Sequence, residues 1–334
     1  MRIEDCVLTG DFVVGAPFTR TEPEDEWVLA RNSGKIPVEL FDFYRRAHYL
    51  SFGSAPSFLA DADNILFSYF SMLLRSVMDS FIESDEQLQS FIGEQKLTYD
   101  AGKKLRGETW DPSADIRVRR HFRNFLIALQ TSLDALADLI ALFFTGLIPR
   151  LHFGRAQFSR VEAWLSRPLP PFGLILTPYD ERLRQLFNSM APLVHATGPE
   201  RDWLPLMRML RNKAAHLGHP VFRQVGLHDR TPKFYTFIPR QWPYIWERHM
   251  KPRGSPSPYG PDFLERFFLE TLMHQDVVSY GSGLHDKVTR VVQAGISELA
   301  ETYNQFQDFP LNTTALAELQ GNSESYNFER FPNA

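Results

Sequence analysis

The stretch HFRNFLIALQTSLDALADLIALFF, residues 121–144, decides the fold class of this 334-residue chain. Its large apolar residues recur every three or four positions, which is the spacing of one face of an α-helix. These residues are Phe122, Leu126, Leu129, Leu133, Leu136, Ile140 and Phe143. With Ser113 as N-cap, the pattern predicts one helix that ends near Phe144. A helix of this length is typical of a helical bundle, where it is buried on more than one side.

Helical spacing also extends along the chain in both directions from this stretch. From Asp61 onward, the apolar positions Leu66, Phe70, Leu73, Val77 and Phe81 form one stripe. Residues 93–112 contain three glycines and several charges, and we interpret them as a loop. Further helices are expected at about 41–50, 156–166, 177–196, 202–217 and 262–306, the last bent near Gly281 and Gly283. The sequence therefore predicts a mainly α fold, an up-and-down helical bundle.

The helical spacing of apolar residues ends at Pro220, and the pattern changes after it. Residues 221–227 and 233–238 are β-like and are separated by turn residues, which predicts a β-hairpin insertion at about 221–238. We therefore divide the chain into a mixed N-terminal segment (1–60), a helical bundle carrying the hairpin (61–307) and a loosely ordered tail (308–334).

The helix predicted before the hairpin has well-defined ends and carries the residues best suited to chemistry. Asp202 is a suitable N-cap, and Gly218 followed by Pro220 ends the pattern. Arg211, Asn212 and His216 place a guanidinium, a carboxamide and an imidazole within about two turns of it. At this composition, Arg-Asn with a His at one fixed spacing, five residues after the Arg, is expected roughly 0.03 times by chance.

These three residue types suit the cleavage of RNA by its own 2'-hydroxyl. That reaction needs a general base to take the hydroxyl proton and a cation to hold the doubly charged phosphorane. His titrates near neutral pH, and Arg forks onto phosphate oxygens. The alternative is a surface helix with two bases near its C-terminal end, where the helix dipole favours cations.

A helix ending in Arg-Asn-x-x-x-His within a helical chain resembles the HEPN superfamily (higher eukaryotes and prokaryotes nucleotide-binding). The resemblance covers roughly residues 60–218 and the C-terminal helix. It implies a metal-independent endoribonuclease without a cofactor, with Arg211, Asn212 and His216 as catalytic residues at a site shared across a homodimer. It further implies a toxin or phage-defence effector with an antitoxin or another regulatory partner. The alternative is a non-catalytic nucleotide- or RNA-binding protein, or a helical assembly protein.

Three other groups of residues are candidates for a functional role. Gln130, Asp134 and Asp138 share one stripe, which we interpret as solvent-facing; the alternatives are that Asp134 or Asp138 orients Arg211, or that both bind a metal. For RNA binding we favour Arg240, Trp242, Arg248 and Lys251, which mix bases with an aromatic ring; the alternative is a hairpin packed on the bundle, with Trp242 and Trp246 in the core. The competing RNA surface is the basic cluster Arg117, Arg119, Arg120, His121 and Arg123, which we otherwise interpret as a solvated helix face because no aromatic residues for base stacking lie among its bases.

Composition limits the remaining possibilities. A net charge of −4 argues against a protein that coats nucleic acid without specificity. The single cysteine, Cys6, excludes an internal disulfide and a cysteine-based zinc site, and fits a reducing compartment. The acidic N-terminus is unlike a signal peptide, and the longest uncharged apolar stretch, 139–148, is short for a membrane span. We therefore expect a cytoplasmic protein without a membrane segment.

Overall fold

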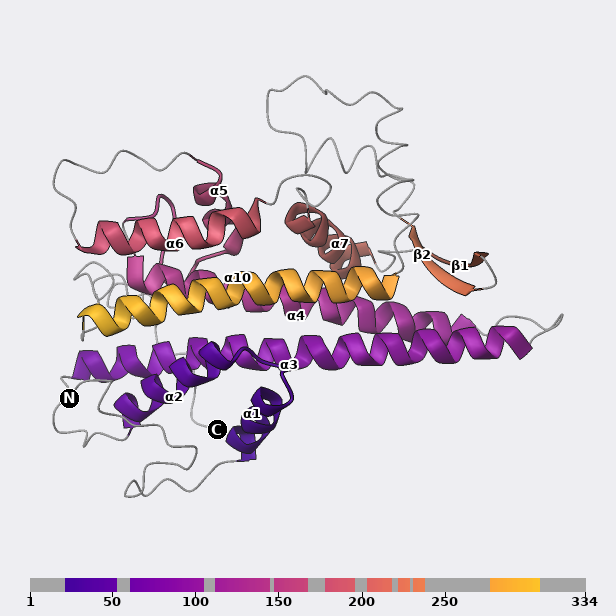
Figure 1. The fold of residues 1–334 in the computed structure, drawn as a ribbon, viewed down its shortest axis with the longest axis horizontal. Coiled ribbons are helices and arrows are strands. Elements are labelled where there is room, and N and C mark those ends of the chain that lie inside the picture. Colours follow the sequence, from indigo (N-terminus) through magenta and orange to yellow (C-terminus); the bar gives the residue numbers. More distant parts are fainter. Residues whose placement is uncertain are drawn as a thin grey trace, which may run out of the picture. The chain divides into compact units, whose positions relative to one another are not determined.

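The computed structural model of the chain describes residues 22–52, 61–104, 112–144, 147–167, 178–195, 203–217, 222–228, 231–237 and 277–306. This part is mainly helical, as the sequence predicts (Figure 1). Its helices are α1 (Glu22–Asn32), α2 (Val38–Phe52), α3 (Asp61–Lys104), α4 (Pro112–Phe144), α5 (Phe158–Leu165), α6 (Pro178–Val194), α7 (Trp203–Leu217) and α10 (Val277–Phe306). The strands β1 (Phe222–His228) and β2 (Thr231–Phe237) pair antiparallel, with Phe222 opposite Phe237.

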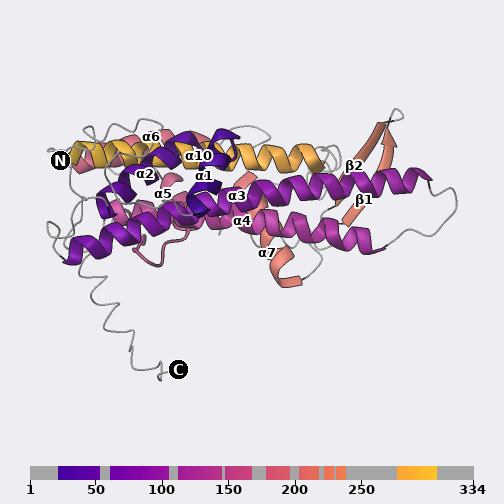
Figure 2. The same ribbon diagram turned by 90° about the horizontal axis from the view of Figure 1, so that it is seen from below.

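The chain divides into two compact units. Unit 1 comprises Met1–Asp79, Ser132–Val194 and Arg290–Ala334, and unit 2 comprises Ser80–Thr131 and His195–Thr289. Three of the four boundaries fall within α3, α4 and α10, which Figure 2 shows from below, and the fourth falls directly after α6. The predicted separation of residues 1–60 from the bundle stays a prediction.

The sequence pattern predicts the two longest helices with different success. α4 spans Pro112–Phe144, and the seven apolar positions of its predicted stripe are each at most 2% exposed. The loop predicted at residues 93–112 is wrong for residues 93–104, because α3 continues to Lys104. Residues 105–111 lie outside the described part of the chain. Phe91 and Gln95 extend the buried face of α3, each 1% exposed, while a Cβ at Gly93 would meet open space. Burial of this face offsets the roughly 1 kcal/mol that a glycine costs inside a helix.

The N-terminal helix α1 is absent from the sequence prediction, whereas α2 contains the predicted helix at 41–50. Trp27 explains the position of α1. The residue is 2% exposed, its indole Nε1–H donates to Asp79 Oδ1 at 2.7 Å, and the Arg75 guanidinium lies 4.9 Å from its ring centroid. One aromatic residue therefore fixes α1 on α3.

The core of unit 1 is aromatic. Phe70 on α3 meets Phe43 of α2 edge to face at 5.2 Å between centroids, and Phe143 of α4 in the same manner at 5.7 Å. Its ring stacks on Tyr303 of α10 at 6.2 Å. Phe70 and Phe143 belong to the predicted apolar stripes and Tyr303 to the predicted inner face of the last helix. Four helices of unit 1 therefore meet around Phe70.

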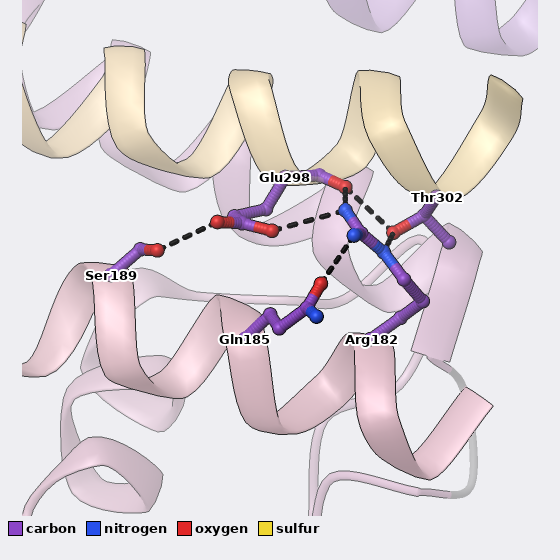
Figure 3. A network of polar contacts seen from close by, with 5 residues as sticks. All are labelled: Arg182, Gln185, Ser189, Glu298 and Thr302. Atoms are coloured by element: carbon purple, nitrogen blue, oxygen red, sulfur yellow. Dashed lines mark hydrogen bonds and ion pairs between the residues drawn. The ribbon is translucent and has the colours of Figure 1, made fainter. Parts of the chain in front are cut away.

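A buried ion pair joins α6 to α10 within unit 1 (Figure 3). Arg182 donates from Nη2 to Glu298 Oε2 at 3.0 Å and to the Glu298 carbonyl at 2.9 Å, and from Nε to Thr302 Oγ1 at 3.1 Å. Its Nη1 also donates to Gln185. The second carboxylate oxygen of Glu298 accepts from Ser189 at 2.7 Å. Both charges thus have partners that compensate for the loss of water.

Unit 2 packs α3, α4 and α10 around phenylalanines. Phe91 and Phe122 lie 5.1 Å apart between ring centroids, and the ring of Phe81 meets that of His285 edge to face at 5.9 Å. At Gly281 of α10, an added Cβ would lie 3.0 Å from the Leu88 side chain. The helices therefore approach closely at Gly281.

One of the described helices has the length and apolar character of a membrane span. This segment is Ile116–Phe144 of α4. Its most apolar stretch of 18 residues has a mean hydropathy of 1.7, and 78% of this stretch is buried inside the protein. The core helix of a soluble protein passes the same test, so this is weak evidence for a span. The expectation of no membrane segment stays a prediction.

Candidate functional site

The candidate catalytic motif lies at the C-terminal end of α7 in unit 2. α7 begins at Trp203 and ends at Leu217, directly after the predicted N-cap Asp202 and directly before the predicted stop Gly218. Residues of its N-terminal part are buried: Trp203, Leu204, Leu206, Met207, Met209 and Leu210 are each at most 4% exposed. The buried residues anchor the helix and leave Arg211 and Asn212 at the edge of the packed face.

Arg211 and Asn212 interact directly with each other. Arg211 Nη1 donates to Asn212 Oδ1 at 2.9 Å, in an exposed position. The Nε of Arg211 is buried and has no hydrogen-bond partner among the described residues. The guanidinium thus extends from the protein interior to the surface. Asn212 itself is exposed, so its carboxamide is accessible to solvent and fixes one edge of the guanidinium.

The backbone of His216 belongs to the same unbroken helix, four residues after Asn212. Residues four apart in an α-helix lie one above the other on the same face. The side chains of residues 213–217, including His216, lie outside the described residues. A His216 imidazole near the Arg211 guanidinium therefore stays a prediction from helix geometry.

Asp134 and Asp138 lie on α4 in unit 1, where they bind backbone N–H groups of the segment before and at the start of α5. The Phe158 N–H donates to Asp134 Oδ1 at 2.9 Å, and the Ala156 N–H donates to Asp138 Oδ1 at 3.1 Å. The N-cap residue of α5, Gln157, makes no capping bond with its side chain. Asp134 instead accepts from the N–H of Phe158, the first residue of α5, and its negative charge suits a helix N-terminus.

The interpretation of this stripe as solvent-facing is wrong. Gln130 is 5% exposed, and both aspartates are half-buried. The side chains are covered because the segment after α4 folds back over the helix, an event that spacing alone does not reveal. The prediction that Asp134 or Asp138 orients Arg211 stays a prediction, since Arg211 belongs to the other unit.

Burial changes the acidity of this region of unit 1. Burial raises the pKa of Asp138, and the negative charge of Asp134 raises it further. Hydrogen bonds from the N–H groups of Ala156 and Gly154 act in the opposite direction and lower the pKa in part. Burial also raises the pKa of Tyr69, with a smaller contribution in the same direction from Asp138. Gly154 adopts φ +74, a left-handed conformation that suits glycine and aims its N–H in the turn before α5. The two acids thus order this turn.

The remaining predicted site residues lie outside the described part of the chain. They are Arg240, Trp242, Arg248 and Lys251. Among the described residues, no group of three or more His, Cys, Asp or Glu side chains could hold a metal ion. The predictions that these residues contact RNA and that the chemistry needs no metal stay predictions from the sequence.

Two buried polar groups on α10 of unit 2 did not enter the sequence-based site. His285 Nε2 and Tyr280 Oη are buried without a hydrogen-bond partner among the described residues. Burial lowers the pKa of His285, against the opposing charges of Asp85 and Asp286, and burial raises the pKa of Tyr280. The sequence signal for His285 is its position beside Leu284, one turn before Val288 on the apolar face of α10.

No family model matches the chain, and no curated protein and no solved structure is found to be similar to it.

Proposed function

We propose that this chain is a metal-independent endoribonuclease of the HEPN type that cleaves RNA through attack of the 2'-hydroxyl. The observation that carries the proposal is the placement of Arg211, Asn212 and the His216 backbone in one unbroken helical segment of α7. The tether between Arg211 and Asn212 supports it further, because a guanidinium fixed at 2.9 Å from a neighbouring amide oxygen loses less freedom on binding phosphate.

In this proposal each residue of the motif has its own task. His216 removes the proton from the 2'-hydroxyl, whose oxygen attacks the adjacent phosphorus and displaces the 5'-oxygen of the next nucleotide. Arg211 binds the phosphate oxygens and stabilises the added negative charge of the phosphorane. Asn212 holds the guanidinium in place. The products are a 2',3'-cyclic phosphate and a 5'-hydroxyl, so atoms and charges balance without a metal ion.

The protonation of the leaving oxygen calls for a second acid. A second copy of the motif across a two-fold axis supplies it, and we therefore propose a homodimer with the two motifs facing one cleft. The fold that accompanies this proposal is an up-and-down helical bundle with β1 and β2 as a hairpin insertion. A cytoplasmic toxin or phage-defence effector, controlled by an antitoxin or another regulatory partner, is the biological setting that the HEPN resemblance favours.

The test uses the purified full chain with a mixture of structured and unstructured RNAs in EDTA. Cleavage that persists in EDTA and leaves 2',3'-cyclic phosphate ends is expected. Arg211→Ala and His216→Ala should each lower the rate on the order of 10²–10⁴-fold, the usual contribution of such groups. Cleavage abolished by EDTA would overturn the mechanism.

The same experiment distinguishes the alternatives. Binding of RNA or nucleotides without cleavage identifies a non-catalytic binding protein with the same helix. If the chain neither binds nor cleaves RNA, the remaining alternative is a helical assembly protein. A protein that is monomeric by light scattering at micromolar concentration would remove the shared site.

A further inference from the structure

The N-terminal half of α4 carries the most concentrated positive charge among the described helices. Four arginines and one histidine occur between Ile116 and Leu133, and this stretch contains no aspartate or glutamate. The whole chain has a net charge of −4. The positive charge on this part of α4 is therefore a local feature, because the chain as a whole is acidic.

Contacts within unit 2 engage two of these side chains. Arg117 Nε donates to Glu94 Oε2 at 3.1 Å, as an ion pair between α4 and α3. The Nδ1 of His121 lies 2.9 Å from Gln87 Oε1. These side chains fasten α4 to α3. Their contribution to binding a further anion is correspondingly small.

Arg120 and Arg123 are in a different situation. Arg120 is exposed, and no hydrogen bond or ion pair joins it to a residue that the structure describes. Arg123 is half-buried and makes only a long contact, 3.4 Å from Nε to Asn124 Oδ1. At 1.5 Å of rise per residue, their Cα atoms lie about 4.5 Å apart along the helix axis. Both residues lie on the face of α4 opposite the buried Phe122, Phe125 and Leu129.

We propose that Arg120 and Arg123, the α4 arginine pair, bind consecutive phosphates of an RNA strand. The choice of RNA rests on the proposed function; the binding of a phosphate chain rests on the pair itself. Two guanidinium groups, unopposed by acids along the helix, can each fork onto phosphate oxygens. A flexible single strand adapts its phosphate spacing to the pair, which a rigid protein partner does not.

A membrane surface fits this helix less well than a phosphate chain. Amphipathic helices bind lipid by burying their apolar face among the acyl chains. The apolar face of α4 is already used, since Phe122, Phe125 and Leu126 are at most 2% exposed in the core. Exposed Ile116, at 58%, and half-buried Ile127 are the apolar residues left beside the arginines. Charge alone is therefore available, and it suits a polyanion.

The experiment measures fluorescence anisotropy of a labelled 2'-O-methyl RNA strand, which the full chain binds without cleaving it. Arg120→Glu/Arg123→Glu is compared with Arg155→Glu/Arg160→Glu, an equal change of charge at exposed arginines of unit 1. We expect the α4 variant to lose affinity at least about tenfold at low salt. Its salt dependence, log K against log salt, should flatten by about 1.4, the contribution of two phosphates on a single strand.

Each outcome decides a separate question. Equal loss in both variants, or none in the α4 variant with circular dichroism unchanged, overturns the inference. If the α4 variant cleaves unmodified RNA with the same kcat/KM as the parent, the inference about the α4 arginine pair is overturned, while the nuclease proposal stands. RNA binding that depends on the pair, without cleavage of any unmodified RNA, supports the pair and removes the nuclease. Pair-dependent binding to phosphatidylserine vesicles without RNA binding would replace RNA by a membrane.

Discussion

Arg182 and Glu298 form an ion pair at 3.0 Å between α6 and α10, with side chains that are 10% and 21% exposed. Within the described part of the chain, every hydrogen bond of the pair reaches a residue of these two helices (Figure 3). A buried pair of this kind adds little stability over a well-packed apolar pair, but the loss of one partner leaves the other charge buried and unpaired.

We therefore expect Arg182→Ala to lower the free energy of unfolding by about 3 kcal/mol, measured by urea denaturation. The matched control is Arg184→Ala on the same helix, where the arginine is exposed and the change should cost less than about 1 kcal/mol. Similar losses in the two variants would show that the Glu298 carboxylate finds other partners or water.

Asp138 allows a prediction in which two substitutions have opposite effects. Burial raises the pKa of this carboxyl, so its charged form is less favourable in the folded than in the unfolded chain. Asp138→Asn removes the charge and keeps an oxygen that accepts from the Ala156 N–H, and it should raise the free energy of unfolding at pH 7. Asp138→Ala removes the acceptor, and an unpaired buried N–H costs about 1–3 kcal/mol.

The pH dependence of these variants provides the check. A carboxyl with a raised folded pKa gives the protein stability at low pH, which is lost as the pH rises through its unfolded and then its folded value. The advantage of Asp138→Asn over the parent should therefore shrink as the pH falls from neutral through the raised folded pKa, and it should stop changing below the ordinary aspartate value of 3.8. An advantage that is constant with pH would contradict the buried charge as its cause.

His285 in unit 2 should make the protein acid-sensitive. Burial lowers its pKa from 6.5, and the unfolded chain therefore binds a proton first as the pH falls. Stability should be full above about pH 6.5, decline below it, and level off once the pH passes the lower folded pKa. His285→Gln should remove this decline in thermal unfolding curves between pH 7 and pH 5, whereas His152→Gln, at an exposed histidine, should keep it.

The motif arginine can be tested for geometry as well as charge. Arg211→Lys keeps the positive charge, but an ammonium lacks the planar fork that binds Asn212 and a phosphate together. We expect the lysine variant to cleave RNA at least about tenfold more slowly than the parent, close to the alanine variant. Full activity with lysine would mean that a point charge is sufficient and that the contact with Asn212 has no part in the reaction.

The helices that the sequence predicts are those whose apolar residues continue at helical spacing to a clear end. α4 and α7 have such patterns. The predicted cap Asp202 and stop Gly218 directly flank α7, whereas α4 begins at Pro112, one residue before the predicted N-cap Ser113. α1 contains few apolar residues, and its place depends on contacts of Trp27 with α3, which no local pattern encodes. The sequence predicts too short a helix for α3, because three glycines and several charges in residues 93–112 favour a loop.

The polar residues show the same limit. Spacing correctly places Gln130, Asp134 and Asp138 on one stripe of α4, but their burial depends on a turn that returns from residues 150–158. The Arg182–Glu298 pair joins positions 116 residues apart in sequence, and neither residue belongs to a recognisable motif. In the candidate catalytic helix, adjacent Arg211 and Asn212 were identifiable from the sequence, while the bond between their side chains was not.

Two glycines of α10 should respond to alanine in opposite directions. At Gly283 an added Cβ would meet nothing within 4 Å, so Gly283→Ala should raise the free energy of unfolding by about 0.5–1 kcal/mol through helix propensity. At Gly295 the Cβ would lie 3.0 Å and 3.1 Å from the two Cδ atoms of Leu136 and 3.5 Å from its Cγ.

Leu136 is fully buried on α4, so its side chain cannot turn away from the new methyl group without displacing neighbours. Overpacking of a core typically costs about 1–3 kcal/mol, which exceeds the gain in propensity. Gly295→Ala should therefore lower the free energy of unfolding. Leu136→Ala alone leaves a cavity and should cost about 2–5 kcal/mol. The double variant should lose less than the sum of the two single losses, because the new methyl group occupies part of that cavity. Urea denaturation of the single and double variants measures the coupling between the two residues. Additive effects of Gly295→Ala and Leu136→Ala would mean that α4 and α10 do not meet at these residues in solution.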